Sequence, residues 1–235
     1  MSGGDRGTND GRRHWLLAID TATSEVVVAA GARDGDLLGA TLIRAGHRHG
    51  EVLLPAIGRL QGELNLRRSR IDAIVVGTGP GAFTGLRVGI ATAKALAHAL
   101  ERPIVGISTG EALIAAARAA DGAGEVVLLL PAGPSDRVVV RAGRPPSLLP
   151  GGTEPEVAAG EQVVAVDLEG RAPAVAVERG EAARRGLAAT LIRLGADRLA
   201  GGAGDDLARL VPEYVTLPRG VRASSGEVAW SRDRR

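Results

Sequence analysis

AIVVGTGPGAFTGLRVGIATAKALAHAL, residues 73–100, predicts a strand, a tight loop and a long helix in succession. Gly79 and Gly81 flank a proline and let the backbone turn sharply. Thr84 or Gly85 can begin the helix, whose free N–H groups and positive dipole end then face the loop. Such a corner suits either an anion or a closely packed partner segment.

The rest of the first half extends this unit on both sides. Three β-type runs precede it and form a predicted meander, and strands then alternate with helices, so the sheet should become partly parallel. Asp20 ends the first strand beside three hydroxyl residues. The predicted elements are strands Trp15–Asp20, Glu25–Gly31, Leu37–Arg44, 73–77 and 103–108, and helices 51–64, 84–100 and 110–120.

The second half carries weaker patterns. A turn at 121–124 favours a domain boundary, and Pro and Gly make 144–156 a predicted loop. We expect strands at 125–130, 137–142, 163–167 and 174–177, a helix at 181–193, and a helical turn with an extended segment at 207–217. The predicted organisation is a disordered arm 1–13, a lobe 14–121 completed by part of 205–220, a smaller lobe 122–204 and a polar tail 221–235.

Composition narrows the function classes. Hydrophobic residues make up 45% of the 235 residues, enough for a substantial core. The chain has no cysteine, which excludes disulfides, thiolate metal sites and a cysteine nucleophile. A net charge of +2 and only four aromatic residues (two Trp, one Tyr, one Phe) are not typical of a nucleic-acid platform. No apolar run is long enough to span a membrane, and the first fourteen residues lack the apolar region of a signal peptide, so we expect a cytoplasmic protein without membrane contact.

Several short motifs resemble catalytic signatures. Residues 106–110, GISTG, match a hydrolase nucleophile elbow around Ser108, but all four histidines precede that serine, whereas the elbow needs one after it. A strand-to-helix turn with Ser108 or Thr109 as the helix cap is the favoured interpretation of these residues. Residues 77–82 match a relaxed dinucleotide pattern that the proline would obstruct, and no Gly-Lys-Ser/Thr ends the loop as in a P-loop.

Two further groups remain open as binding sites. His47 and His49 could place two imidazoles on one face of an extended loop, although no third metal ligand is evident nearby. Arg67, Arg68 and Arg70 form a basic connector that either stays solvated or meets phosphate in an assembly.

Residues 20–24, DTATS, carry more weight. A carboxylate after a strand, followed by hydroxyls, resembles the first phosphate loop of the actin-like, sugar-kinase and Hsp70 ATPases. An ordinary Asx or Ser/Thr turn fits the same residues. If a nucleotide binds, the candidate contacts are Asp20, Thr21, Gly79 and Gly81.

Taken together, five segments closely resemble the TsaB (YeaZ) family. The resemblance is strong over 16–120, faint over 125–200 and resumes at 212–219, and GPGxFTGxRxG is its most specific part. The segments are LLAIDTATSEVVVAA (16–30), HGEVLLPAIGRLQGEL (49–64), VVGTGPGAFTGLRVGIATAKALA (75–97), PIVGIS (103–108) and LVPEYVTLPR (210–219).

The resemblance implies an α/β fold of two actin-like lobes, the ASKHA or RNase H-like architecture with mixed sheets flanked by helices. It also implies a role in N6-threonylcarbamoylation of adenosine 37 in tRNAs that read ANN codons. In that role the chain is not the enzyme: it pairs with a TsaD-like catalytic paralogue and acts with a TsaE-like ATPase. tRNA is met only through the complex, and ATP or ADP binds only in the assembled complex, with no cofactor in the isolated chain.

Comparison with the paralogue supports a non-catalytic role. TsaD-like members carry two metal-binding histidines in a VNHLEGH segment, and the matching residues 107–113 place Thr109 and Leu113 at the ligand positions. Neither side chain replaces an imidazole on a transition metal. The predicted helix 51–64 also lacks the pair of histidines four residues apart that the paralogue carries. We therefore expect no metal site and no catalytic residue.

The two long helices are the expected partner surface. By the resemblance they form a helical bundle with the paralogue, and the same face can form a homodimer when the partner is absent. Both helices carry apolar or small residues at helical spacing. The interface candidates are Leu53, Leu54, Ile57, Leu60, Arg87, Ala91 and Lys94, each of which could instead pack on its own sheet.

One segment departs from the family pattern. Residues 130–136, LPAGPSD, stand where relatives carry an Asp-Ala-Arg-type segment and an acidic turn. Two hypotheses follow for the whole chain: a dimerisation subunit, or an actin-like phosphotransferase or metal-dependent hydrolase that uses Asp20. A third, weaker hypothesis is a peptidase-like protein. The absence of the metal ligands and of a histidine after Ser108 argues against it.

Overall fold

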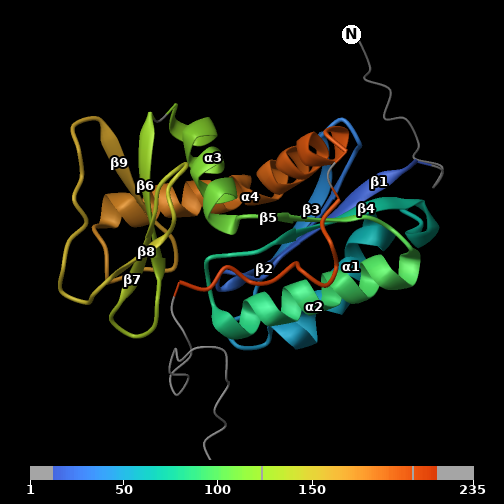
Figure 1. The fold of residues 1–235 in the computed structure, drawn as a ribbon, viewed down its shortest axis with the longest axis horizontal. Helices are drawn as coiled ribbons and strands as arrows, with labels where there is room; N and C mark the ends of the chain where they lie inside the picture. Colours follow the sequence, from blue (N-terminus) through green and yellow to red (C-terminus); the bar gives the residue numbers. More distant parts are fainter. Residues whose placement is uncertain (1–12, 123, 203, 216–235) are drawn as a thin grey trace, which may run out of the picture.

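The first sheet is built from the strands nearest the amino terminus. The computed structural model describes residues 13–122, 124–202 and 204–215 (Figure 1). The strand order is β3-β2-β1-β4-β5, in which β1 to β3 pair antiparallel and β1, β4 and β5 pair parallel. The bounds are β1 Trp15–Asp20, β2 Glu25–Gly31, β3 Leu37–Arg44, β4 Ile71–Gly77 and β5 Ile104–Ile107.

Helices cover both faces of this sheet. Alternation along β1 sends Trp15, Leu17 and Ile19 to one face, where they pack with α1 and α2, and sends Leu16 and Ala18 to the other. The predicted elements between residues 15 and 121 are confirmed with shifts of one or two residues at their ends. The helices are α1 His49–Glu63, α2 Phe83–Leu100 and α3 Thr109–Asp121, with a 3₁₀ turn at Arg68–Arg70.

The second sheet has the order β8-β7-β6-β9, with β6 parallel to β9 and antiparallel to β7. Two predictions for this half are wrong. The predicted loop 144–156 contains a short strand that pairs with β7, and residues 174–177, predicted as a strand, form the first turn of α4. The bounds are β6 Glu125–Pro131, β7 Arg137–Val140, β8 Ser147–Leu149, β9 Glu161–Ala165 and α4 Ala174–Ala200.

A physical reason accounts for the difference at residues 174–177. Valines at 175 and 177 mimic the alternation of a strand, but Pro173 supplies a helix-compatible φ at the N-cap and Val175 stays half exposed. The predicted helix 181–193 is the middle of this longer helix. The predicted helical turn in 207–217 is present as a single turn, in which the Arg209 and Leu210 amides both donate to the Asp206 carbonyl, and the rest of its described part, up to residue 215, has irregular backbone.

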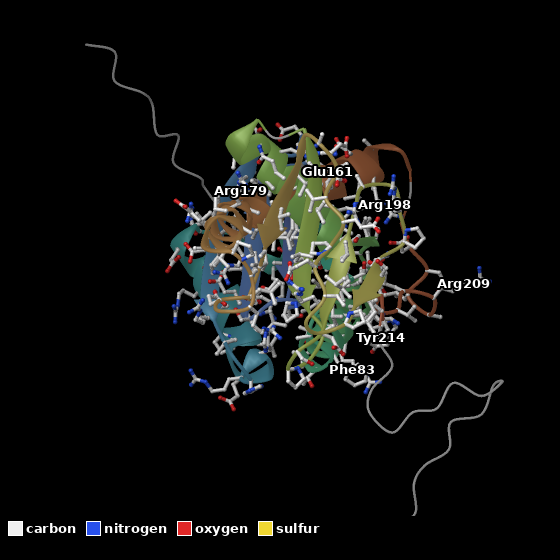
Figure 2. All side chains as sticks on the ribbon, turned by 90° about the vertical axis from the view of Figure 1, so that its left-hand side faces the viewer. Phe83, Glu161, Arg179, Arg198, Arg209 and Tyr214 are labelled. Atoms are coloured by element: carbon white, nitrogen blue, oxygen red, sulfur yellow. The ribbon has the colours of Figure 1, made fainter. Side chains whose placement is uncertain are left out.

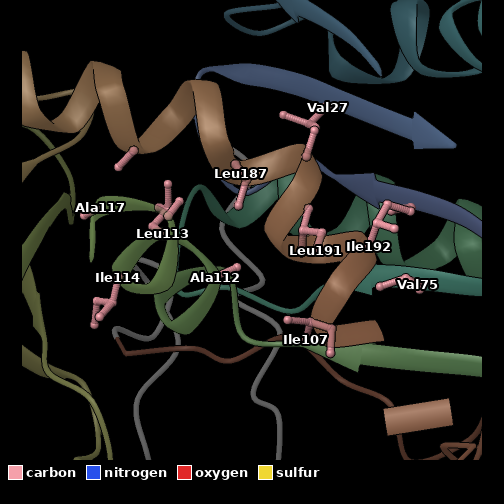
Figure 3. Packing of buried hydrophobic residues seen from close by; sticks show 14 of the residues in the cluster. Val27, Val75, Ile107, Ala112, Leu113, Ile114, Ala117, Leu187, Leu191 and Ile192 are labelled. Atoms are coloured by element: carbon pink, nitrogen blue, oxygen red, sulfur yellow. The ribbon is translucent and has the colours of Figure 1, made fainter. Parts of the chain in front are cut away.

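α4 joins the two sheets. It runs from the second sheet onto the face of the first sheet opposite α1 and α2 (Figure 1). Figure 3 shows Leu187 and Leu191 of α4 in the same buried cluster as Leu113 of α3 and Val27 of β2. The predicted lobe 122–204 is therefore not self-contained, because its last helix also covers the first sheet. Of the predicted arm 1–13 only residue 13 is described, and the tail 221–235 lies outside the described residues.

Small residues let α4 approach this closely. A Cβ on Gly180 would stand 1.9 Å from the carbonyl oxygen of Ala165 in β9, and one on Gly195 would stand 2.4 Å from a methyl of Val75 in β4. The first obstacle is backbone and cannot rotate away. Glycine is therefore required at position 180 because of the close contact with β9, and not because of its backbone conformation.

We predict that Gly180→Ala lowers the free energy of unfolding by about 2 kcal/mol, because overpacking against backbone outweighs the better helix propensity of alanine. The control is Gly58→Ala in α1, where no atom lies within 4 Å of the new Cβ and a gain of about 0.5–1 kcal/mol is expected. Urea unfolding measures both variants. Equal effects of the two substitutions would contradict the packing of α4.

Candidate functional site

Asp20 is the candidate reactive group, and the structure encloses it completely. Its side chain is 0% exposed at the end of β1. The Thr109 hydroxyl donates to Oδ2 at 2.6 Å, and the Ala22 amide donates to Oδ1 at 2.8 Å. Burial raises the pKa of Asp20 to about 6 from 3.8, although both hydrogen bonds oppose that shift. Both oxygens thus have partners inside the chain.

The loop predicted to turn at Gly79 packs against the same network. A Cβ on Gly77 would lie 1.8 Å from Oδ2 of Asp20, so a side chain at this position would displace the carboxylate. Gly79 has a φ of +105°, which favours glycine, and its amide donates to the Thr109 hydroxyl at 3.1 Å. Asp20, Thr109 and the amide of Gly79 therefore form one buried chain of hydrogen bonds.

The turn after Asp20 fills the amino-terminal end of α2. Thr21 is buried and donates to the Gly85 carbonyl at 2.8 Å, while the Ala82 amide donates to the Ala22 carbonyl at 2.7 Å. The sequence suggested either an anion or a closely packed segment at this corner, and in the structure the closely packed segment 21–24 lies there. Three glycines four residues apart leave the space: a Cβ on Gly81, Gly85 or Gly89 would lie 2.1–2.2 Å from Ala22 or Thr21.

The carboxyl-terminal segment forms a strap, residues 204–215, over the outside of this corner. The Glu213 amide donates to the Thr78 carbonyl at 2.8 Å, and Lys94 Nζ donates to the Leu210 carbonyl at 3.1 Å. Partial burial raises the pKa of Glu213, although a hydrogen bond from Ser108 at 3.2 Å opposes that shift. The sequence linked residues 212–219 to the family ending but did not reveal this position.

The remaining sequence motifs do not assemble a catalytic group. Ser108 caps α3 by accepting from the Glu111 amide at 3.4 Å, so the helix-cap interpretation of GISTG is confirmed. His49 is buried at the start of α1 with Nε2 2.9 Å from the Thr23 carbonyl, whereas His47 is exposed. Among residues 13–122, 124–202 and 204–215, no group of three potential metal ligands comes together.

The unusual segment 130–136 ends β6 and turns into β7. Arg171 Nη1 donates to the carbonyls of Gly133 and Pro134, both at 2.8 Å, and Asp136 accepts from the Gly151 amide at 2.9 Å. These contacts stay within the second sheet and its loops. The segment is therefore a structural turn, held by an arginine and an aspartate.

The predicted interface residues divide into two groups. Leu53, Ile57 and Leu60 are at most 5% exposed and belong to the core between α1 and the first sheet, so we withdraw them from the partner surface. The apolar stripe of an amphipathic helix faces its own sheet, which explains their burial. Leu54 is 58% exposed, Arg87 and Ala91 are exposed, and Lys94 is half-buried by its bond to the strap.

An aromatic cluster at the start of α2 was not predicted from the sequence. Phe83 and Tyr214 lie near each other (Figure 2), with their ring centroids 5.1 Å apart. The Arg87 guanidinium lies 3.8 Å from the centroid of the Phe83 ring. Arg87 Nε also donates to the Tyr214 hydroxyl at 3.0 Å. The chain has only four aromatic residues, and this rarity was the one feature of the sequence that could have drawn attention to Phe83 and Tyr214. We call Leu54, Arg87, Ala91, Phe83 and Tyr214 the α1–α2 surface.

Comparison with known proteins places the chain in a family. The family model described as "TsaD: tRNA N6-adenosine threonylcarbamoyltransferase" matches residues 43–190. The chain is 33% identical over 107 residues to the tRNA threonylcarbamoyladenosine biosynthesis protein TsaB of Bacillus subtilis, covering 46% of each, and 37% identical over 94 residues to TsaB of Escherichia coli, covering 40% of each. It thus spans about half or less of the length of the curated relatives that it matches.

A solved structure matches over a longer region. YeaZ from Pseudomonas aeruginosa aligns with 86% of this chain and 99% of its own, at a TM-score of 0.66 and 27% sequence identity. The two-lobed α/β architecture with mixed sheets, expected from the resemblance, is thereby confirmed. Within the described residues, no helix is both long enough and apolar enough to cross a membrane. The chain belongs to the TsaD family of that model and, by its relatives and its structural neighbour, to the TsaB (YeaZ) family.

Proposed function

We propose that this chain is a non-catalytic subunit that dimerises with and activates the enzyme forming N6-threonylcarbamoyladenosine at position 37 of tRNAs reading ANN codons. The relatives named TsaB support a role in this biosynthesis. The proposed partner is a TsaD-like catalytic subunit, with which a TsaE-like ATPase acts, and tRNA is met only through the complex. A match to the TsaD family model supports a partner of similar fold.

The enclosure of Asp20 is the observation that carries the proposal. An aspartate that orients a metal-bound water or receives a proton must reach the substrate. Here both oxygens bond within the chain, the side chain is 0% exposed, and Thr21 and Ala22 occupy the amino-terminal end of α2. A phosphotransferase or hydrolase that uses Asp20 would first have to open this packing.

The α1–α2 surface supports the partner role. It combines an arginine and a tyrosine, residue types enriched where binding energy concentrates, with a phenylalanine and an exposed leucine. Small residues such as Ala91 allow a second helix to approach closely. In the absence of the partner the same surface serves a homodimer, and ATP or ADP binds only in the assembled complex.

We predict that Leu54→Glu and Ala91→Glu each weaken binding to the TsaD-like protein of the same organism by more than about 100-fold. Burying a carboxylate in an apolar contact costs several kcal/mol, and each 1.4 kcal/mol is a factor of ten in affinity. Calorimetry or co-purification with the wild-type chain as reference measures the loss.

The matched control is Leu148→Glu, which places the same charge on a leucine of β8 that is 46% exposed and far from α1 in the sequence. It should bind normally. Thermal unfolding should be little changed in all three variants, because the three side chains are exposed. Normal binding by both helix variants would show that the α1–α2 surface is not the interface.

We predict that Asp20 makes the protein more stable as the pH falls from 7.5 to 5. The folded pKa of about 6 exceeds the unfolded value of 3.8, so the folded state binds the proton more tightly. The resulting stability is fully present below 3.8 and is lost as the pH rises through 6. Urea unfolding at the two pH values should show a gain of about 1 kcal/mol for the wild type relative to Asp20→Asn. A pH-independent difference would mean that the carboxylate titrates like a solvated one.

The same variant tests catalysis. With the TsaD-like and TsaE-like proteins present, Asp20→Asn should support threonylcarbamoylation of tRNA at the wild-type rate within about twofold, because the amide preserves the acceptor for Ala22. A loss of about 100-fold or more with normal folding would instead favour chemistry by Asp20.

A further inference from the structure

A polar contact between the two halves of the fold centres on Asp167, between β9 and α4. The Ser24 amide donates to its Oδ2 at 2.6 Å and the Ser24 hydroxyl to its Oδ1 at 2.6 Å. Arg184 Nη1 of α4 donates to the same Oδ1 at 2.7 Å. The carboxylate thus receives three hydrogen bonds, two from Ser24, which precedes β2, and one from Arg184 in α4.

The donors of Ser24 and Arg184 together form a preorganised site for an anion. Arg184 is only 6% exposed, and its second carboxylate neighbour, Glu25, lies 3.9 Å from Nε, too far for a strong hydrogen bond. A guanidinium this buried needs an anionic partner, since an unpaired charge in the interior is costly. Ser24 contributes two donors that face the two oxygens of one carboxylate, which selects an anion with adjacent oxygen atoms.

Asp167 has a backbone conformation that is less favourable for aspartate than for glycine, which indicates that the side chain of Asp167 serves a purpose at this position. Its φ is +57°, in the left-handed region that glycine adopts more easily than aspartate. Two further ion pairs cross this junction: Arg184 with Glu25 at 3.9 Å, and Arg44 with Glu169 at 3.8 Å, whose side chains are 67% and 53% exposed and are screened by solvent. The contact between Asp167, Ser24 and Arg184 has shorter polar distances, 2.6–2.7 Å, and ties the loop both to Ser24 and to α4.

We propose that Ser24 and Arg184 form a binding site for a small carboxylate-type anion, which Asp167 fills in cis and thereby latches the second sheet to the first. The ligand is an intramolecular one, and any free carboxylate of the right size can replace it when the Asp167 side chain is removed. This inference does not rest on the proposed function, because it concerns a contact within one chain.

The test removes the internal ligand and supplies it from solution. Asp167→Gly keeps the backbone conformation accessible and deletes the carboxylate. We expect its thermal midpoint to fall by on the order of 10 °C. Sodium formate at about 100 mM should then raise that midpoint by a few degrees more than sodium chloride of equal ionic strength, saturably, because the ligand binds only the folded state.

Three comparisons make the result specific. Formate should have no such effect on the wild type, whose site is filled, or on Asp167→Gly combined with Ser24→Ala, which lacks the hydroxyl donor. Glu169→Gln should leave the midpoint within about 1 °C, because that side chain is exposed. An unchanged midpoint in Asp167→Gly, or an equal response to formate in the Ser24→Ala background, would overturn the proposal.

A second measurement covers the case in which Asp167→Gly does not fold. Asp167→Asn keeps the size of the side chain and removes its charge, and it can be combined with Ser24→Ala in a double-mutant cycle followed by urea unfolding. We expect the loss in the double variant to be clearly smaller than the sum of the single losses. Additive losses would show that the two residues do not share one site and would overturn the proposal.

Discussion

The close approach of the turn 21–24 to the first turns of α2 is the constraint on which the rest of the structure depends. Gly81, Gly85 and Gly89 form a row along this side, where Cβ atoms would collide with Thr21 or Ala22. The row brings backbone against backbone and seals the end of β1. Asp20 consequently loses contact with solvent, and its carboxylate must find donors inside the chain, which Thr109 and Ala22 supply.

A buried carboxylate with only neutral hydrogen-bond donors differs from one that faces a cation. The two donors lower the pKa of Asp20 but do not cancel the effect of burial, so the net shift is upward. Asp167 instead faces a cation, the guanidinium of Arg184 at 2.7 Å, and accepts two hydrogen bonds from Ser24. Both aspartates contact the turn 21–24: Asp20 is buried beneath it, and Asp167 ties it to the second sheet.

The sequence predicted the first half well because local signals agree there. β-branched runs, glycines in the loop and helical spacing all indicate one arrangement for residues 15 to 121. It failed where local pattern and tertiary context disagree: the valines at 175 and 177 sit in a helix, and residues 147–149 form a strand only because β7 lies beside them. The contact between Ser24 and Asp167 joins residues 143 positions apart, and no local pattern encodes it.

The candidate interface illustrates a related limit. Periodicity selects the most apolar face of a helix, and in α1 that face, with Leu53, Ile57 and Leu60, covers its own sheet. A partner can reach only what remains on the other side, such as Leu54 and Ala91, which are too few to form a pattern. Periodicity alone therefore cannot separate a partner surface from a core.

Helix α2 connects the sealed corner around Asp20 to the exposed α1–α2 surface. One side of α2 holds the turn 21–24 with no space to spare, and its first turns carry Phe83 and Arg87, which bind Tyr214 of the strap. A shift of α2 large enough to open the turn would break these aromatic contacts, and the Lys94 bond to the Leu210 carbonyl would have to lengthen as well. The glycine row and the strap thus constrain the same helix from two sides. The Asp20 corner and the α1–α2 surface are therefore built on the same helix.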